Sequence, residues 1–515
     1  MYPGAFSTAS PDKPAIIMSD TGEQVTYAEL EDFSVRLAHV FYEAGLRPGD
    51  SVALLSKNSP LYHQAYWAVL RSGLYLTALN YHLSLEEQRY VLNDCGARVL
   101  ISSSEQADRA ADLIQAASPD LIAFIADGTR EGFRDLSAEL TAASNVPFDH
   151  QPAGLDMQYS SGTTGKPKGV RAPLPTRQVS EPGEPLVSVF APMYGFDAET
   201  VYLSPAPLYH AAPLRFGMII HATGGTVVVM PSFDAEAALA AIEQYRVTHS
   251  QWVPTMFVRM LKLPDEIRSR YDVSSLRVAV HAAAPCPVDV KEQMIRWWGP
   301  VLHEYYAATE AAGITLIGPE DWLAHPGSVG KAVLGVLHVC DPDHPEQPEL
   351  PTGHDGLIYF ERETMPFSYH NDPDKTREAQ HPAHDNWATT GDIGHVDDEG
   401  YLYLTDRRSF MILSGGANIY PQEVENALTL HPAVHDVAVI GVPDPDMGEV
   451  VKAVVVPADG AHPGPELERL LIDHVRDKIA HLKAPRSVDF VEELPRTPTG
   501  KLVKHKLREA YAQTA

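Results

Sequence analysis

A stretch of twelve residues, Tyr159 to Val170, constrains this chain more than any other. It reads Tyr-Ser-Ser-Gly-Thr-Thr-Gly-Lys-Pro-Lys-Gly-Val, with four aliphatic hydroxyls, three glycines and two lysines. Glycines let a backbone curl until several N–H groups point at one anion, while hydroxyls add donors and lysines add charge. The stretch therefore predicts a loop that holds a polyphosphate, with a flexible Ser/Gly linker as the alternative.

The spacing of this loop differs from that of a Walker A loop. That motif requires a glycine, four further residues, and then Gly-Lys followed by Ser or Thr. Here Gly165-Lys166 is followed by Pro167, and Ser160 stands where the first glycine belongs. Pro167 and Gly169 also disfavour a helix that starts directly after the loop. The loop is therefore predicted to hold phosphates in a protein that is not a P-loop NTPase.

The charge balance argues against a nucleic-acid partner. The 515 residues include 40 basic and 68 acidic side chains, for a net charge of −28, whereas nucleic-acid affinity comes from neutralising phosphates. A chain of this length, with 44% hydrophobic residues, is expected to form two or more packed domains. The balance favours a protein with one local positive pocket.

Cysteine content and hydropathy bear on location. The three cysteines, Cys95, Cys286 and Cys340, are scattered, which predicts a reducing compartment without a disulfide framework. The N-terminus has no basic segment followed by an apolar run, and no stretch of about 18 apolar residues occurs. We therefore expect a cytoplasmic protein without a signal peptide or an integral membrane segment.

The first third of the chain alternates between helical and extended patterns. Apolar residues recur at helical spacing from residue 27 to 44, and Ser84 to Glu87 matches a capping box at the start of a later helix. Short apolar runs over residues 51–56, 98–102 and 121–125 predict buried strands. This alternation indicates βαβ units with a mostly parallel sheet, and hence an α/β fold.

The loop from Ser160 to Val170 resembles the signature loop of the acyl-adenylate-forming superfamily, which comprises acyl-CoA synthetases, luciferases and peptide-synthetase adenylation domains. Further segments resemble the other signatures of that family, in the same order, over residues from about 25 to 510. The resemblance implies a large N-terminal domain of parallel and mixed sheets flanked by helices. A small, mobile α+β domain would follow it.

One such segment ends at Glu310 and reads His-Glu-Tyr-Tyr-Ala-Ala-Thr-Glu. By the resemblance, Tyr306 stacks on adenine, Thr309 bonds the α-phosphate, and Glu310 holds Mg²⁺, a cation that prefers oxygen ligands. The family has glycine where this chain has Ala307. Ala284 lies in an earlier run of small residues that would suit a flat adenine against the backbone.

Two more segments complete the implied substrate sites. Asp392, in Trp-Ala-Thr-Thr-Gly-Asp, would accept hydrogen bonds from both ribose hydroxyls, because a carboxylate is an acceptor only. Arg407 would reach the ribose as well. His210, at the end of Leu-Ser-Pro-Ala-Pro-Leu-Tyr-His, resembles the residue beside the acyl pocket of fatty-acyl and aryl-CoA ligases.

The boundary between the implied domains falls after residue 405, which gives an AMP-binding domain over 1–405 and a mobile domain over 406–515. In the family, the segment at this boundary is a hinge with the sequence Gly-Arg-x-Lys/Asp-Asp. This chain has Ser409 and Phe410 at the last two positions. In the smaller domain, Gly415 and Gly416 would line the path of the pantetheine arm of CoA. Lys501 would be the catalytic lysine.

The residues that the resemblance assigns to the nucleotide are Ser160, Ser161, Gly162, Thr163, Thr164, Gly165, Lys168, Ala284, Glu304, Tyr306, Thr309, Asp392, Arg407 and Lys501. Among them, Lys501 and Thr163 join Glu310 as the catalytic set. His210, Gly415 and Gly416 would face the acid and CoA.

The implied activity is that of an ATP-dependent carboxylic acid–CoA ligase. ATP, Mg²⁺ and CoA would be required, acyl-AMP would be formed first, and the acid would be a fatty or bulky, steroid-like one. The expected partners are small molecules, with a homodimer as the assembly left open. The alternatives are an aryl acid–CoA ligase, an enzyme that loads an acyl group on a carrier protein, and a nucleotide-binding protein without catalysis.

Overall fold

The computed structural model describes residues 2–115, 117–160, 167–496 and 502–512. The chain divides into two compact units. The first comprises Met1–Gln251, Asp265–Ala279 and Phe367–Pro373, and the second comprises Trp252–Pro264, Val280–Pro366 and Asp374–Ala515.

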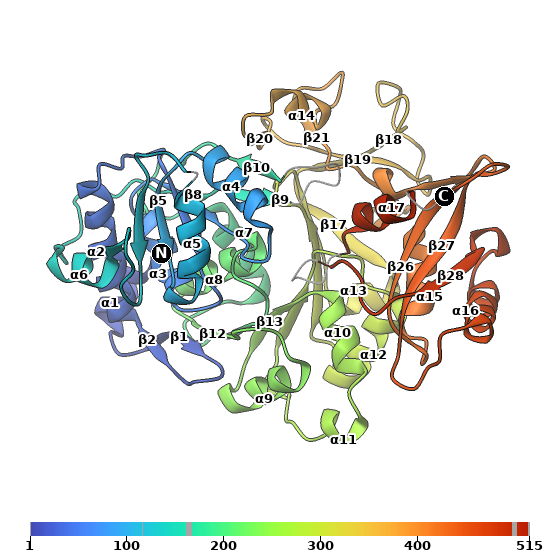
Figure 1. The fold of residues 1–515 in the computed structure, drawn as a ribbon, viewed down its shortest axis with the longest axis horizontal. Helices are drawn as coiled ribbons and strands as arrows, with labels where there is room; N and C mark the ends of the chain where they lie inside the picture. Colours follow the sequence, from blue (N-terminus) through green and yellow to red (C-terminus); the bar gives the residue numbers. More distant parts are fainter. Residues whose placement is uncertain (1, 116, 161–166, 497–501, 513–515) are drawn as a thin grey trace. The chain divides into compact units, whose positions relative to one another are not determined.

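The first unit contains a six-stranded parallel sheet, whose strands fall between residues 51 and 156 (Figure 1). Its order is β7 (Arg134–Asp135), β6 (Ile122–Ile125), β5 (Ala97–Ser102), β3 (Ser51–Leu55), β4 (Tyr75–Ala78) and β8 (Leu155–Asp156). Helix α2 (Tyr27–Glu43) precedes its first strand in the chain, and α3 (Leu61–Leu70), α4 (Leu85–Asp94) and α5 (Ala107–Ile114) lie between successive strands. The predicted capping box is confirmed, because Ser84 and Glu87 bond reciprocally at the start of α4.

Further strands of the first unit run in the order β13 (His249–Trp252), β11 (Val201–Ser204), β12 (Thr226–Val229), β1 (Pro14–Met18) and β2 (Gln24–Thr26). All of these pairs are parallel except that between β1 and β2. Helices α8 (Ala211–Thr223) and α9 (Ala235–Tyr245) follow β11 and β12. Strands buried on both faces explain the continuous apolar run of β12.

The second unit contains an antiparallel arrangement of strands. Its order is β18 (Val336–Cys340), β19 (Gly356–Glu361), β22 (Asp392–Val396), β23 (Leu402–Arg407), β17 (Ser328–Leu334), β16 (Ile314–Ile317) and β15 (Leu302–Ala307). Helices α12 (Val288–Trp298) and α13 (Pro319–Ala324) also belong to this unit. The ends of β15, β22 and β23 hold several residues of the predicted nucleotide site.

A five-stranded sheet ends the second unit, with β24 (Ile412–Ser414), β25 (Ala417–Ile419), β26 (Val434–Asp444), β27 (Gly448–Pro457) and β28 (Ser487–Phe490). Alternate residues of β26 enter different cores: Val437 and Val439 pack with α15 (Pro421–Thr429) and α16 (Pro465–Lys478). Ala438 and Ile440 pack instead with Leu507 of α17 (Lys504–Ala512). This period of two buries both faces of the sheet (Figure 1).

The predicted mixed α/β fold is therefore confirmed, including the small C-terminal sheet with its helices. None of the helices in the described ranges has both the length and the apolar character that a membrane crossing requires.

Candidate active site

An antiparallel pair of strands closes the predicted phosphate loop in the first unit. Strand β9 (Gln158–Ser160) pairs with β10 (Lys168–Arg171), and Lys168 lies opposite Ser160. A Cβ at Gly169 would lie 2.7 Å from Cε of Met157, so this position admits no side chain without a shift. The described part of the chain thus fixes both ends of the loop, whereas Ser161, Gly162, Thr163, Thr164 and Gly165 lie outside the described residues.

Aromatic and polar contacts hold the two ends of this loop. The hydroxyl of Tyr159 donates to Oδ2 of Asp94 at 2.6 Å. Nζ of Lys168 lies 5.2 Å from the centroid of the Tyr369 ring, within the range of a cation–π contact. Tyr369 belongs to β20 (Ser368–Tyr369), which pairs with β10. The ammonium of Lys168 is thus held near the mouth of the loop by a residue that sequence reasoning did not single out.

In the second unit, the structure brings together three residues that were predicted to bind the nucleoside. The Asp392 carboxylate, 8% exposed, accepts from the Tyr306 hydroxyl at 2.7 Å and from Nε of Arg407 at 3.1 Å. Asp392 and Arg407 lie opposite each other in β22 and β23. The Thr390 hydroxyl also donates to Oδ2 of Asp392 at 2.7 Å. Thr390 was missed, although its place two residues before Asp392 was a usable signal.

The hydrogen-bond donors around Asp392 indicate which kind of ligand this carboxylate suits. The hydroxyls of Tyr306 and Thr390 donate to it. The vicinal diol of a ribose offers two donors of the same kind. Burial raises the pKa of the Tyr306 phenol, and the adjacent Asp392 carboxylate raises it further, so the hydroxyl remains a donor. Arg407 places a positive charge beside this carboxylate, with Nε of Arg407 3.1 Å from Oδ1 of Asp392. The residues present fit a ribose.

Asp392→Asn is expected to reduce discrimination between ATP and 2′-deoxy-ATP. The natural enzyme should prefer ATP by about 10-fold or more in kcat/KM, since the deoxy compound has one hydroxyl fewer to donate to this charged acceptor. An amide retains only one oxygen acceptor and no charge, so most of that preference should disappear. Initial rates with both nucleotides measure this, with Asp397→Asn as the control; equal rates for the natural enzyme would contradict the assignment.

The backbone is strained directly after Glu310. Ala311 has a φ of +52°, a left-handed conformation that is uncommon without glycine. Nη1 of Arg362 donates to the Ala311 carbonyl at 3.1 Å and holds this turn. Glu310 itself is largely buried and lies, with Thr309, just beyond the end of β15. Such strain is typical of functional sites, and it supports the assignment of this turn to the site.

Near the predicted adenine segment, the structure contains a buried ion pair that the sequence did not reveal. Ala283, beside Ala284, has a φ of +75°. Nζ of Lys291, which is 0% exposed, lies 2.6 Å from Oε2 of Glu304. Burial raises the pKa of the Glu304 carboxyl, and Lys291 opposes that rise. The side chain of Glu304 is therefore engaged by Lys291 inside the protein core.

In the first unit, His210 occupies the N-cap position of α8 without a capping hydrogen bond from its side chain, and its ring lies against that of Tyr209. The segment before it is held by Asn58, whose Nδ2 donates to the Ala206 carbonyl at 3.0 Å. Oδ1 of Asn58 also accepts from the Leu208 N–H at 2.8 Å. Asn58 was missed, because nothing in its local sequence indicates this partner so far along the chain.

The two glycines predicted to line the CoA path form the turn between β24 and β25. Gly415 has a φ of +57° and Gly416 a φ of +84°. A Cβ at Gly415 would lie 2.5 Å from Cε of Met447, whereas nothing lies within 4 Å of a Cβ at Gly416. The turn thus requires glycine for its backbone, and Gly416 faces open space.

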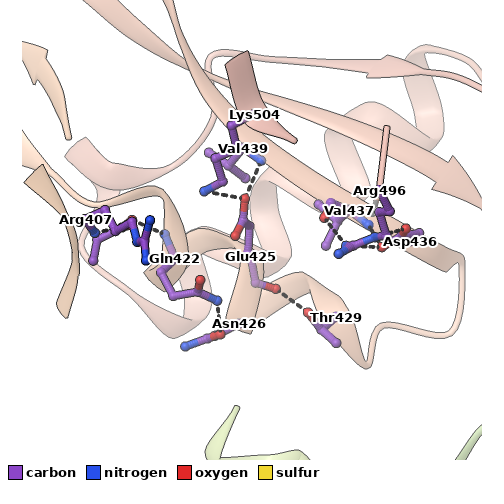
Figure 2. Close-up of polar contacts among 11 residues, drawn as sticks. Arg407, Gln422, Glu425, Asn426, Thr429, Asp436, Val437, Val439, Arg496 and Lys504 are labelled. Carbon is purple, nitrogen blue, oxygen red and sulfur yellow. Dashed lines mark hydrogen bonds and ion pairs between the residues drawn. The ribbon is translucent and has the colours of Figure 1, made fainter. Parts of the chain in front are cut away.

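Lys501 lies outside the described residues, but its flanks are firmly held (Figure 2). Before it, Nε of Arg496 pairs with Oδ2 of Asp436 at 2.6 Å. After it, Nζ of Lys504 lies 2.8 Å from Oε1 of Glu425, and both of these residues are buried. These anchors position the two ends of the lysine segment.

The comparisons with known proteins agree with this geometry. The family model of the AMP-binding enzymes matches residues 5–370, and that of the AMP-binding enzyme C-terminal domain matches residues 423–501. The chain belongs to the AMP-binding enzyme family.

Among its relatives, a feruloyl-CoA synthase from an Amycolatopsis species is 38% identical over 499 residues, which is 95% of this chain and 94% of the relative. The long-chain-fatty-acid–CoA ligase FadD13 of Mycobacterium tuberculosis is 32% identical, covering 99% and 97% of the two chains. The solved structure of the anthranilate CoA ligase AuaEII with anthranoyl-AMP matches with a TM-score of 0.84 and 26% identity, over 99% of this chain and 97% of that one.

Proposed function

We propose that this AMP-binding enzyme is an ATP-dependent carboxylic acid–CoA ligase. It joins a hydrophobic acid to CoA in two steps, through an acyl-AMP. The observation that carries this function is the Asp392 carboxylate, which already accepts two hydroxyls and is paired with Arg407. Two relatives support the reaction, a feruloyl-CoA synthase and a long-chain-fatty-acid–CoA ligase. This chain matches each of them over nearly its whole length.

In the first step, a carboxylate oxygen attacks the α-phosphorus of ATP, and pyrophosphate leaves. Asp392 and Arg407 orient the nucleoside, while Lys168 faces the departing phosphates. Lys501 stabilises the negative charge that develops between the carboxylate and the α-phosphate. Glu310 offers the oxygen ligand that Mg²⁺ prefers, and Mg²⁺ bound to ATP would offset phosphate charge.

In the second step, the CoA thiol attacks the acyl carbonyl carbon, AMP leaves with the electrons of the broken C–O bond, and the thiol proton is released. The small domain, residues 406–515, would turn between the steps, so that Lys501 withdraws and the Gly415–Gly416 turn lines the thiol path. Open space at Gly416 supports this role. The cytoplasm, where both ATP and CoA are present, is the proposed location.

The acid is proposed to be apolar, either fatty or bulky, with an aryl acid as the second candidate. His210 directly precedes α8, and most of the buried residues of this helix are apolar. Such a helix offers an apolar wall but few polar groups to bind a charged side chain. The acyl groups in the relatives' names, a feruloyl group and a long-chain fatty acyl group, carry no charged side group.

A panel of aliphatic, aryl and steroidal acids tests the proposed function. Pyrophosphate release and thioester formation are measured separately with free CoA, with a phosphopantetheinyl carrier protein, and with no acceptor. We expect pyrophosphate release with apolar acids and thioester formation with free CoA. Transfer to the carrier alone would identify a carrier-loading enzyme, and an absence of pyrophosphate release with every acid would contradict ligase activity.

A further inference from the structure

The turn η2 (Arg408–Phe410) connects two sheets of the second unit. It follows β23 of the antiparallel strands and precedes β24 of the small sheet. Its residues contact different parts of the protein, although they are neighbours in the chain. Within this short turn, the contacts change from those with the antiparallel strands to those with the C-terminal helix α17.

Arg408 is held on the side of the nucleotide-site strands. Its N–H donates to the Gly391 carbonyl at 3.0 Å, directly beside Asp392. Its Nη2 pairs with Oδ1 of Asp343 at 2.9 Å, in the segment between β18 and β19. Arg408 therefore stays with the strands that hold the Asp392 cluster.

Ser409 and Phe410 are held by the C-terminal helix α17. Nη1 of Arg508 donates to the Ser409 carbonyl at 3.0 Å, and its Nη2 pairs with Oε1 of Glu449 at 2.9 Å. Nζ of Lys504 lies 5.2 Å from the centroid of the Phe410 ring.

The ammonium of Lys504 is held in place for its contact with the Phe410 ring. It is 6% exposed and is fixed from the other side by Glu425, which also accepts from the Val439 N–H at 2.8 Å (Figure 2). Its ammonium therefore has little freedom to leave the Phe410 ring.

We infer that Arg508 and Phe410 are positioning residues which latch the turn to α17, in the hinge segment that the family resemblance implies. Because α17 follows directly after the lysine segment, releasing the latch changes how that segment is presented to the nucleotide. The inference rests on the proposed two-step function for its catalytic consequence, but the latch itself can be tested without any activity.

The latch has a physical cause in this sequence. Ser409 carries no charge and Phe410 offers only an aromatic face, so neither side chain can form an ion pair of its own. Arg508 and Lys504 supply the two positive charges, one to a carbonyl oxygen and one to a ring. Each contact can be removed by a single substitution, at Arg508 or at Phe410.

Limited trypsin digestion of the full chain tests the latch directly, because trypsin cleaves after arginine and the peptide after Arg408 is exposed. In Arg508→Ala, release of the fragment that starts at Ser409 should become about five-fold faster, since cleavage follows the population of the open turn. Phe410→Leu should act in the same direction, and Phe410→Tyr, which retains the ring, should cleave like the natural protein.

Arg469→Ala is the matched control, because Arg469 also donates to a carbonyl, that of Pro465, on the surface of α16. It should leave cleavage unchanged. Equal cleavage of the natural protein and Arg508→Ala would overturn the latch.

The catalytic consequence is measured as the ratio of adenylation to thioester formation from supplied acyl-AMP. In Arg508→Ala this ratio should change by at least about three-fold, whereas a purely structural loss would lower both rates together. Faster cleavage with an unchanged ratio would overturn the positioning role. If no acid supports adenylation in the natural protein, the proposed function fails, and the cleavage result still decides the latch.

Discussion

Lys291→Met is expected to lower the free energy of unfolding by about 3–5 kcal/mol, the usual cost of removing one partner of a buried ion pair. Lys291 is 0% exposed, and its Nζ lies 2.6 Å from Oε2 of Glu304 and 4.7 Å from the Trp322 ring centroid. Without the ammonium, the carboxylate has the neutral ring of His281 beside it, because burial keeps the pKa of that histidine low. The substitution therefore leaves an uncompensated acid in the core.

Urea unfolding followed by tryptophan fluorescence measures this cost. The double variant Lys291→Met/Glu304→Leu should recover most of the loss, since a pair of apolar residues removes both charges together. Lys331→Met is the control, because Lys331 is exposed and its removal should change stability by about 0.5 kcal/mol or less. A double variant that is no more stable than Lys291→Met would show that packing, rather than the unpaired charge, causes the loss.

Lys501→Ala is expected to reduce adenylation by at least ~100-fold, as the loss of one preorganised electrostatic contact does. Thioester formation from supplied acyl-AMP should persist, because the proposed rotation withdraws Lys501 before that step. Pyrophosphate and acyl-CoA are measured separately. Lys506→Ala is the control, since Lys506 is an exposed lysine five residues further along the chain.

Gly416→Leu should show the opposite pattern and form acyl-AMP without passing the acyl group to CoA. Gly416→Ala separates two causes, because alanine suffers the same strain at a φ of +84° while adding little bulk. If alanine blocks the second step as strongly as leucine does, the backbone conformation is responsible. Equal loss of both steps in Lys501→Ala and Gly416→Leu would contradict the two-position model.

Local pattern was sufficient for much of the fold. Residues 27–44 predict a helix, and α2 spans Tyr27–Glu43. The capping box at Ser84 forms as predicted, because its partners lie only three residues apart. The phosphate loop, Asp392 and Arg407 were identified from the order of short segments, and the structure brings Tyr306, Asp392 and Arg407 together.

By itself, the sequence determined the fold class and the family, and it predicted the residues of the candidate site, because helical period, strand alternation and short motifs depend on near neighbours in the chain. Only the tertiary structure revealed the pairing of Lys291 with Glu304 and the contact of Arg508 with Ser409. These depend on strands and helices that meet through folding. A lysine or an arginine in a sequence gives no sign of whether its partner will be water, a carboxylate or a backbone carbonyl, because burial decides that choice.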